Sequence, residues 1–172
     1  MTILTGLFYT LFITGISQLL FSHRANGSII ANVGSELIGQ KFTSDKYFWS
    51  RPSAIDYNPL PSCGSNLSMV SQKLQDTSVA LTKYFAEKNE ILSGTPIPNE
   101  MIFSSASGLD PHVSIQAVNF QVKRIAKVRQ ISENQIVDLI AKQKEGRQFF
   151  VLGEERVNVL LLNLELDKIS KK

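Results

Sequence analysis

The longest apolar stretch of the chain lies at its start. The first 22 residues contain no Lys, Arg, Asp, Glu or His and are rich in Leu, Ile and Phe. An α-helix rises about 1.5 Å per residue, so roughly twenty residues cross the roughly 30 Å hydrocarbon layer of a bilayer. The pattern predicts one transmembrane helix over residues 2–22. A cleaved signal peptide fits less well, because a basic segment before the apolar run and a small-residue cleavage site are both missing.

Small and polar residues recur every four positions within this apolar stretch, and two interpretations of them remain open. Such a ridge lets a second helix approach closely, which predicts a packing face for a partner helix. Alternatively, the Thr hydroxyls bond back to the carbonyl four residues earlier and face lipid. The ridge consists of Thr2, Gly6, Thr10, Thr14 and Gln18.

The rest of the chain predicts a linker over residues 23–33 and one mixed α/β domain over residues 34–172. A short strand is expected near Leu37 and Ile38. The segment 46–68 is dense in aromatic residues, and its prolines exclude a continuous helix. Its aromatic residues carry much apolar surface, so the segment is expected to pack over the core rather than act as a flexible linker. These residues are Tyr47, Phe48, Trp49 and Tyr57.

Helical spacing dominates the middle of the domain. Apolar residues near every 3.6 positions predict a helix with Asn66 as N-cap that ends near Asn89, followed by a short buried strand at 101–103. Ser114 is expected to cap a second helix with a buried stripe and with four basic residues, 123, 124, 127 and 129, largely on its other faces. Ser132 and Gln135 form a predicted capping box for a third helix.

The C-terminal segment allows two interpretations. Residues 149–152 and 157–161 could be two strands around a turn at Gly153, or Asn158 could cap a final helix that runs through Leu166. We favour one strand followed by a short helix.

Composition narrows the class of protein. The net charge of +3 is too small to indicate nucleic-acid binding. Cys63 is the single cysteine, so no intrachain disulfide or thiolate metal cluster is possible. The chain left after the apolar stretch is long enough for one domain with its own core, but Arg24, the first basic residue, is weak evidence for which side of a membrane that domain occupies.

Residues typical of three kinds of functional site are present without the spacing that those sites need. Ser104, Ser105, Ser107, Asp110 and His112 include the ingredients of a hydrolase triad, but a tight turn explains them equally well and no G-x-S-x-G elbow is present. A phosphate-binding loop is not matched around residues 34–42. The two histidines lie far apart in sequence, which gives a zinc site little support. We therefore predict no catalytic residue, no metal and no cofactor of the chain's own.

Five runs of sequence resemble one known family. The chain is similar to the C subunit of the Kdp potassium-transporting ATPase, and the order SASGLDPH is the most specific of the matching runs. The runs are GSELIGQKF (34–42), YFWSRPSA (47–54), YNP with GSNL (57–67), SASGLDPHVSIQAVNFQVKRIAKVR (105–129) and VNVLLLNLELD (157–167). The family motif positions are Arg51, Pro52, Ser53, Gly64, Ser65, Asn66, Ser107, Gly108, Leu109, Asp110, Pro111, His112, Asn158 and Asn163.

The resemblance implies an accessory role in a high-affinity potassium uptake pump of the cell inner membrane. The implied partners are the potassium-binding subunit KdpA, the ATP-hydrolysing subunit KdpB and membrane lipid, so ATP and potassium act at the level of the complex. It further implies a cytoplasmic N-terminus, an extracytoplasmic domain, and either a structural clamp or a chaperone that raises the ATP affinity of the hydrolysing subunit. The alternatives from the residues are a membrane-anchored hydrolase and a ligand-binding module outside the cytoplasm.

Overall fold

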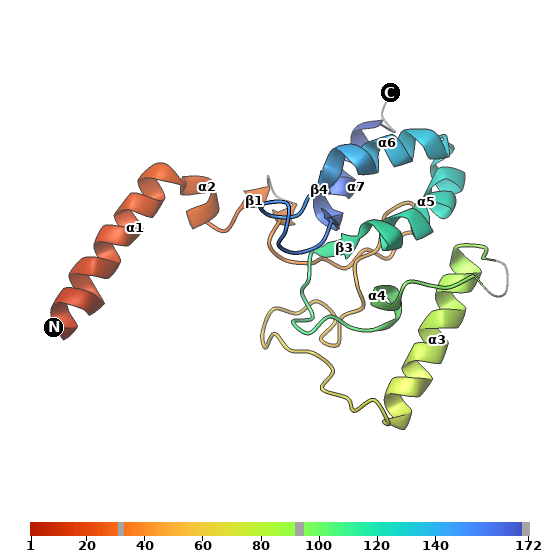
Figure 1. The fold of residues 1–172 in the computed structure, drawn as a ribbon, viewed down its shortest axis with the longest axis horizontal. Coiled ribbons are helices and arrows are strands. Elements are labelled where there is room, and N and C mark those ends of the chain that lie inside the picture. Colours follow the sequence, from red (N-terminus) through yellow and green to blue (C-terminus); the bar gives the residue numbers. More distant parts are fainter. Residues whose placement is uncertain (31–32, 92–94, 170–172) are drawn as a thin grey trace. The chain divides into compact units, whose positions relative to one another are not determined.

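The computed structural model describes residues 1–30, 33–91 and 95–169 of the chain. They form two compact units, Met1–Ile38 and Gly39–Lys172, which are described separately below. The described chain is mixed α/β, as the sequence predicts (Figure 1).

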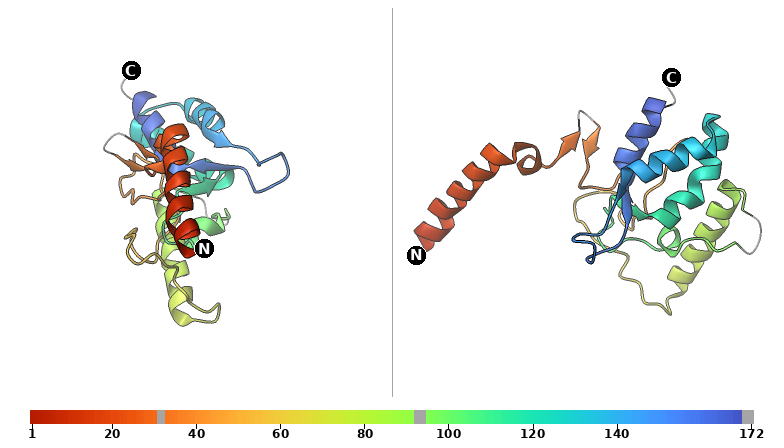
Figure 2. Two further views of the ribbon diagram at one scale, coloured as in Figure 1. Left: turned by 90° about the vertical axis from the view of Figure 1, so that its left-hand side faces the viewer. Right: turned by 45° about the horizontal axis from the view of Figure 1, so that its top comes forward.

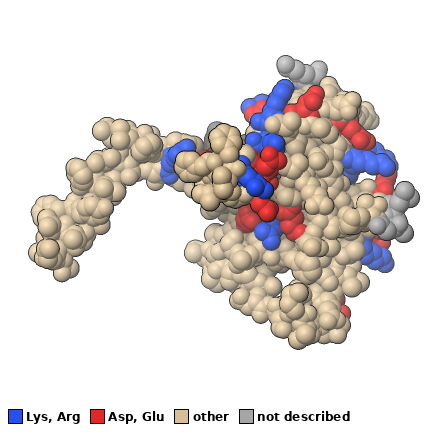
Figure 3. Space-filling view, in the orientation of Figure 1, with Lys and Arg blue, Asp and Glu red and all other residues tan. Residues whose placement is uncertain are grey.

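The first unit consists of helices followed by two very short strands. A π-helix, η1 (Leu4–Phe8), leads directly into α1 (Tyr9–Leu20), and a single turn, α2 (Ser22–Ala25), follows. Among the described residues, no helix has both the length and the apolar character needed to cross a membrane. In Figure 3 the stretch that begins the chain shows neither acidic nor basic surface, because Arg24 is its first charged side chain.

The threonines of the first unit make the backbone hydrogen bonds of the second interpretation given above. Thr10 Oγ1 donates to the carbonyl of Gly6 at 2.9 Å, and Thr14 Oγ1 donates to the carbonyl of Thr10 at 2.8 Å. These bonds do not exclude a packing face on the same ridge. A Cβ built on Gly6 meets nothing within 4 Å, so the space beside this glycine is open. A packing face on this helix therefore stays a prediction.

The strand expected near Leu37 and Ile38 lies slightly earlier. β1 (Ile29–Ile30) pairs antiparallel with β2 (Gly34–Ser35), and residues 36–38 form a turn and bend. Ser35 Oγ donates to the carbonyl of Gly27 at 2.6 Å and accepts from the backbone N–H of Leu37. These bonds fold the chain away from the ladder before the apolar pair is reached.

The second unit is built around a three-stranded antiparallel sheet with the order β3-β5-β4. β5 (Arg156–Asn158) lies in the middle, between β3 (His112–Ser114) and β4 (Lys144–Glu145). The helices α5 (Ile115–Arg129), α6 (Glu133–Gln143) and α7 (Val159–Ile169) contact this sheet or each other (Figure 1). The buried core draws on β3, β5, the three helices, the aromatic segment and residues 85 and 101. Its members include Phe48, Trp49, Phe85, Met101, Val113, Val118, Ile125, Ile136, Val157, Leu162 and Leu166.

Three helix starts follow the predicted caps. Ser114 accepts the N–H of Ala117 at the start of α5, and Ser132 with Gln135 forms the capping box of α6. Asn158 Oδ1 accepts the N–H groups of Leu160 and Leu161, so β5 passes directly into α7. Of the favoured interpretation of the C-terminal segment, a strand followed by a helix, the helix after Asn158 is confirmed, and the strand that precedes it is Arg156–Asn158.

Two helical elements differ from the prediction. α3 (Gln72–Lys88) begins six residues after Asn66, with Ser71 at its N-cap position, although its C-cap is Asn89, near which the end was expected. The chain before α3 is instead bonded to a distant segment, because Ser62 Oγ donates to the carbonyl of Ser107 at 2.8 Å. The prediction of a strand at 101–103 is wrong as well. One helical turn, α4 (Asn99–Ile102), buries Met101 completely, and a run of three apolar residues carries no period to distinguish the two structures.

Residues 149–152 are not a strand either. They form a tight, exposed turn between β4 and β5, with positive φ at Phe149 (51°) and Phe150 (65°). Left-handed backbone at two successive residues is incompatible with an extended strand.

Candidate functional site

The family motif residues meet where the aromatic segment contacts the chain before β3. At the centre is Asp110, whose Oδ2 lies 3.1 Å from Nη1 of Arg51 and whose Oδ1 accepts the backbone N–H of His112 at 3.0 Å. The carboxylate thus joins two segments that are 59 residues apart in sequence. Arg51 Nε is buried and has no hydrogen-bond partner in the described part of the chain. The guanidinium of Arg51 is therefore paired with a carboxylate through its Nη1 contact with Asp110.

His112 lies between two carboxylates on neighbouring elements. Its Nδ1 is 3.9 Å from Asp110 Oδ1, and its Nε2 is 3.5 Å from Glu145 Oε1 on β4. In the sheet His112 is directly opposite Asn158, the residue that caps α7. The backbone N–H of Val159 also donates to the carbonyl of Pro111 at 2.9 Å. The motif residues of the fourth and fifth runs are therefore neighbours in space.

The Arg-Pro-Ser run is folded back on itself by Tyr57. The Tyr57 hydroxyl donates to the carbonyl of Arg51 at 2.6 Å, and Ser53 Oγ accepts the N–H of Tyr57 at 2.9 Å. Burial raises the pKa of Tyr57 to about 12, with the charge of Asp56 adding to the effect. Pro52 is tied to the other segment, because its carbonyl accepts the N–H of Ser105 at 3.2 Å.

Two motif glycines allow the two segments to approach closely. Gly108 has φ of +71°, and a Cβ placed there would lie 2.6 Å from Ile55 Cγ1 and 2.8 Å from the carbonyl oxygen of Cys63. A Cβ on Gly64 would lie 2.8 Å from the carbonyl oxygen of Ala106. Neither gap can hold a side chain, so glycine is required at both positions. Ser65 and Asn66, which follow Gly64, are exposed. The carbonyl of Leu109, which follows Gly108, accepts the N–H of Gly39 at 2.7 Å.

Asn163, the last motif residue, holds the buried aromatic segment. Its Oδ1 accepts the N–H of Phe48 at 2.8 Å, and its Nδ2 donates to the carbonyl of the same residue at 2.9 Å. A side-chain amide therefore pairs with Phe48 as a neighbouring strand would. The prediction that Phe48 and Trp49 pack in the core is confirmed.

Two arginines on α5 continue this role and correct the prediction of a basic flank. Arg124 is buried, with its guanidinium carbon 3.6 Å from the centroid of the Trp49 ring. It donates to the carbonyls of Asp45 and Tyr47 and to Asn89 Oδ1, and burial lowers its pKa to about 10. Arg129 pairs with Asp167 at 2.7 Å. A segment without helix or strand leaves its backbone carbonyls unpaired, so that nearby basic side chains are needed as donors. The prolines of the aromatic segment were the sequence signal for these inward-pointing arginines, and the prediction of a basic flank did not use it.

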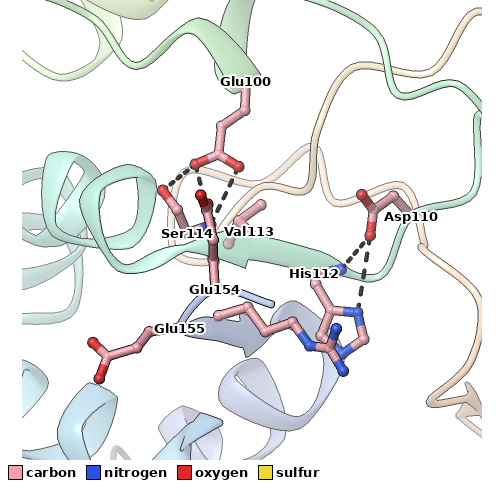
Figure 4. A pocket seen from close by; sticks show the side chains of 8 residues that line it. Glu100, Asp110, His112, Val113, Ser114, Glu154 and Glu155 are labelled. Atoms are coloured by element: carbon pink, nitrogen blue, oxygen red, sulfur yellow. Dashed lines mark hydrogen bonds and ion pairs between the residues drawn. The ribbon is translucent and has the colours of Figure 1, made fainter. Parts of the chain in front are cut away.

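A pocket of about 240 Å³ adjoins the motif residues, and Figure 4 shows its lining. Glu100 points across it to Ser114, whose backbone N–H donates to Oε1 at 3.1 Å and whose hydroxyl also donates to this carboxylate. Asp110 and His112 line the side of the pocket towards the start of β3, and the remaining lining residues are Val113, Glu154, Glu155 and Arg156.

The residues of the hydrolase hypothesis build a turn. Asp110 Oδ1 accepts the N–H of His112, and Ser107 Oγ accepts the N–H of Leu109 at 3.1 Å. Within residues 1–30, 33–91 and 95–169, none of Ser104, Ser105 and Ser107 hydrogen-bonds to the imidazole of His112. A search of the same residues finds no group of three or more His, Cys, Asp or Glu that could hold a metal ion.

Fold and site together describe a small mixed α/β domain whose motif residues fasten an irregular aromatic segment to a three-stranded sheet. Comparison with known proteins finds a match over nearly the whole chain. The family model described as KdpC, K+-transporting ATPase, c chain, matches residues 1–168. The chain belongs to the KdpC family.

Curated relatives match this chain over most of their own lengths. The potassium-transporting ATPase KdpC subunit of Koribacter versatilis is 49% identical over 172 residues, which cover 96% of this chain and 88% of that protein. The KdpC subunit of Myxococcus xanthus is 46% identical, covering 96% of this chain and 82% of its own length. The KdpC subunit of Caldanaerobacter subterraneus is 45% identical, covering 99% and 90%.

Proposed function

We propose that this chain is a non-catalytic subunit of an ATP-driven potassium uptake pump and that it stabilises the assembly of the potassium-binding subunit KdpA with the ATP-hydrolysing subunit KdpB. The observation that carries the proposal is membership of the KdpC family over residues 1–168. The named relatives are subunits of potassium-transporting ATPases, so a pump made of several chains is the setting.

The contacts of the motif residues support a structural role. Asp110 pairs with Arg51, Asn158 caps α7 and Asn163 binds the backbone of Phe48, so each of these side chains is used to hold the domain together. A clamp between other subunits needs such a rigid domain, because contact surfaces that are fixed in advance lose less entropy on binding.

We further propose that the N-terminal stretch anchors the chain in the cell inner membrane by a single pass, with the N-terminus cytoplasmic and the domain outside the cytoplasm. The lack of charged side chains in the first 22 residues and the helical backbone of η1 and α1 support this arrangement. An extracytoplasmic domain has no access to cytoplasmic ATP. Any effect on the ATP affinity of KdpB is then allosteric and requires contacts that differ between states of the pump.

The test is affinity purification of the tagged full-length chain from mild detergent, with its companions identified by mass. Recovery of KdpA and KdpB in fixed proportion is the expected result, and an untagged chain in the same membranes is the control. Recovery of this chain alone, from membranes that contain both other subunits, would refute the proposal.

A second measurement addresses the ATP affinity. The pump is reconstituted with and without this chain, and its ATPase rate is followed against ATP concentration. A lower KM for ATP in the presence of the chain is expected if the coupling operates. An unchanged KM would restrict the chain to assembly.

A further inference from the structure

His112 stands in the middle of a row of alternating charges that crosses the second unit. Asp110 Oδ2 pairs with Arg51 at 3.1 Å, and the other oxygen, Oδ1, lies 3.9 Å from His112 Nδ1 (Figure 4). On the other side of the ring, Glu145 Oε1 lies 3.5 Å from His112 Nε2, while Glu145 Oε2 pairs with Arg156 at 3.0 Å. Each carboxylate therefore offers one oxygen to an arginine and the other to the same imidazole.

The protonation state of this imidazole decides whether both of its contacts are attractive. An ionised carboxylate only accepts hydrogen bonds, and a neutral imidazole carries a proton on one of its two nitrogens. A neutral His112 therefore turns a lone pair towards either Asp110 or Glu145. A protonated ring has an N–H group at both nitrogens and a positive charge, so it attracts both carboxylates at once.

The charged groups around the ring are mostly acidic. They come from α4, from the chain before β3, from β4 and β5 and from the connection between these two strands. Among the described residues, the acidic groups are Glu100, Asp110, Glu145, Glu154 and Glu155, and the basic groups are Arg51, Lys144 and Arg156. With five acidic groups against three basic groups, a positive charge at His112 meets surroundings of net negative charge.

The contact between His112 and Glu145 joins the two outer strands of the sheet across the middle strand. β4 has two residues and lies at one edge, and His112 belongs to β3 on the other side of β5. In the left view of Figure 2 the connection that follows β4 projects away from the rest of the unit that carries it. Local opening begins where few contacts hold a segment. An ion pair to β4 therefore acts where the sheet is weakly held.

We infer that His112 is a pH-sensitive latch. When its ring is protonated, it ties β4 to the turn at Asp110 across the sheet, and when the ring is neutral, one of the two ties is released. The side chain is 25% exposed, so it exchanges protons with the solvent. The stabilising effect is present on the acidic side of the range in which histidine changes its charge, and it is lost as the pH rises. The latch belongs to the domain alone and does not rest on the proposed function.

Hydrogen exchange of backbone amides, followed by mass spectrometry, tests the latch in the full-length chain in mild detergent. Exchange is measured at about pH 6 and about pH 8, on either side of the charge change of histidine, and corrected for the intrinsic rates of an unfolded chain. Protection of the segment that contains β4 should be about threefold greater at the lower pH, as expected for one partly exposed ion pair.

The chain offers a matched pair of histidine variants. His112→Gln should abolish the difference in protection between the two pH values. His23→Gln removes the other of the chain's two histidines, which lies in the first unit, and should keep the difference. A difference that persists in His112→Gln, or that disappears in His23→Gln, would overturn the inference.

A second pair of variants leaves the histidine in place. Glu145→Gln keeps the size of the side chain and removes its charge, so the ring gains no ion pair at Nε2 and the pH difference should disappear. Glu155→Gln is the control, because it removes the ion pair of Lys144 on the same strand without touching the ring. The control should lower protection at both pH values and keep their ratio. If Glu145→Gln retains the ratio of the unsubstituted chain, the ring does not tie β4 and the inference is wrong.

Discussion

At the scale of single residues, Gly108 shows that close packing around a motif position excludes every side chain larger than that of glycine. Its φ of +71° already favours glycine, and the chain also passes within 2.6 Å of the place where a Cβ would be. Gly153 has a similar φ of +78° but no atom within 4 Å of its missing Cβ. The two positions therefore separate the cost of backbone strain from the cost of a steric clash.

We expect Gly108→Ala to lower the free energy of unfolding by about 3 kcal/mol and Gly153→Ala by about 1 kcal/mol. The first substitution adds strain and a clash with Ile55 and the carbonyl of Cys63, and the second adds strain alone. Urea unfolding of the full-length chain in detergent, followed by the fluorescence of Trp49, the chain's single tryptophan, gives both values. Equal losses would show that the segments separate to make room.

Tyr57 makes the stability depend on alkaline pH. Its pKa is raised from 10.0 to about 12 in the folded chain by burial. Below pH 10 both states hold the phenolic proton, so this group adds no pH dependence. Between about pH 10 and 12 the unfolded chain releases the proton and the folded chain retains it, so the free energy of unfolding falls as the pH rises.

The expected loss from Tyr57 over this window is on the order of 2 kcal/mol. Tyr57→Phe should flatten this part of the pH profile, although the variant is less stable at neutral pH by about 1 kcal/mol because the bond to Arg51 is lost. Unfolding in urea at a series of pH values compares the two slopes. A variant with the slope of the unsubstituted chain would place the alkaline transition on another group.

At the scale of elements, α5 holds the aromatic segment by side chains that point inward from a basic helix. Arg124 reaches the carbonyls of Asp45 and Tyr47, and Gln121 pairs with the backbone of Trp49 through both ends of its amide. In the part of the chain that the structure describes, residues 45–49 pair with no strand, so these side chains satisfy backbone polar groups of the segment.

Arg124→Met should therefore lower the free energy of unfolding by about 3 kcal/mol, because it leaves buried acceptors without donors. Lys123→Met, one residue earlier on the same helix and exposed, is the control and should change stability by less than about 0.5 kcal/mol. Circular dichroism during urea unfolding measures both variants without relying on Trp49, which contacts Arg124. Similar values for the two would mean that water replaces the guanidinium.

The elements also show which features of the fold the sequence could predict. Ser114, Ser132 and Asn158 start their helices as expected, because an N-cap acts on residues two or three positions away. The predicted start of α3 and the predicted strand at 101–103 were wrong. The chain before α3 is bonded to a distant segment through Ser62, and a run of three apolar residues has no period that separates a strand from a helical turn. The motif cluster was predicted as a set of residues, but the pairing of Asp110 with Arg51 and the burial of Arg124 depend on tertiary structure that no local pattern contains.

At the scale of the whole molecule, the proposed function allows the chain to meet other subunits through its domain, through its N-terminal stretch, or through both. The ridge of Thr2, Gly6, Thr10, Thr14 and Gln18 is the predicted contact of the second kind. The hydroxyls of Thr10 and Thr14 donate to carbonyls within the helix, and Gly6 and Gly15 leave open space beside the backbone. A surface with shallow side chains and satisfied polar groups allows two helices to approach closely.

Replacement of Gly6, Thr10 and Thr14 together by Leu should reduce the recovery of KdpA and KdpB with the tagged chain by about tenfold, because three bulky side chains separate the helices. The matched control is Phe12→Leu, Ile16→Leu and Leu19→Ile, which alters the opposite side of a helix that turns ~100° per residue and keeps it apolar. Quantitative mass analysis of complexes purified in mild detergent provides the measurement. If the ridge variant and the control recover the partners equally, the N-terminal stretch holds the chain without a specific helix contact, and assembly depends on the domain alone.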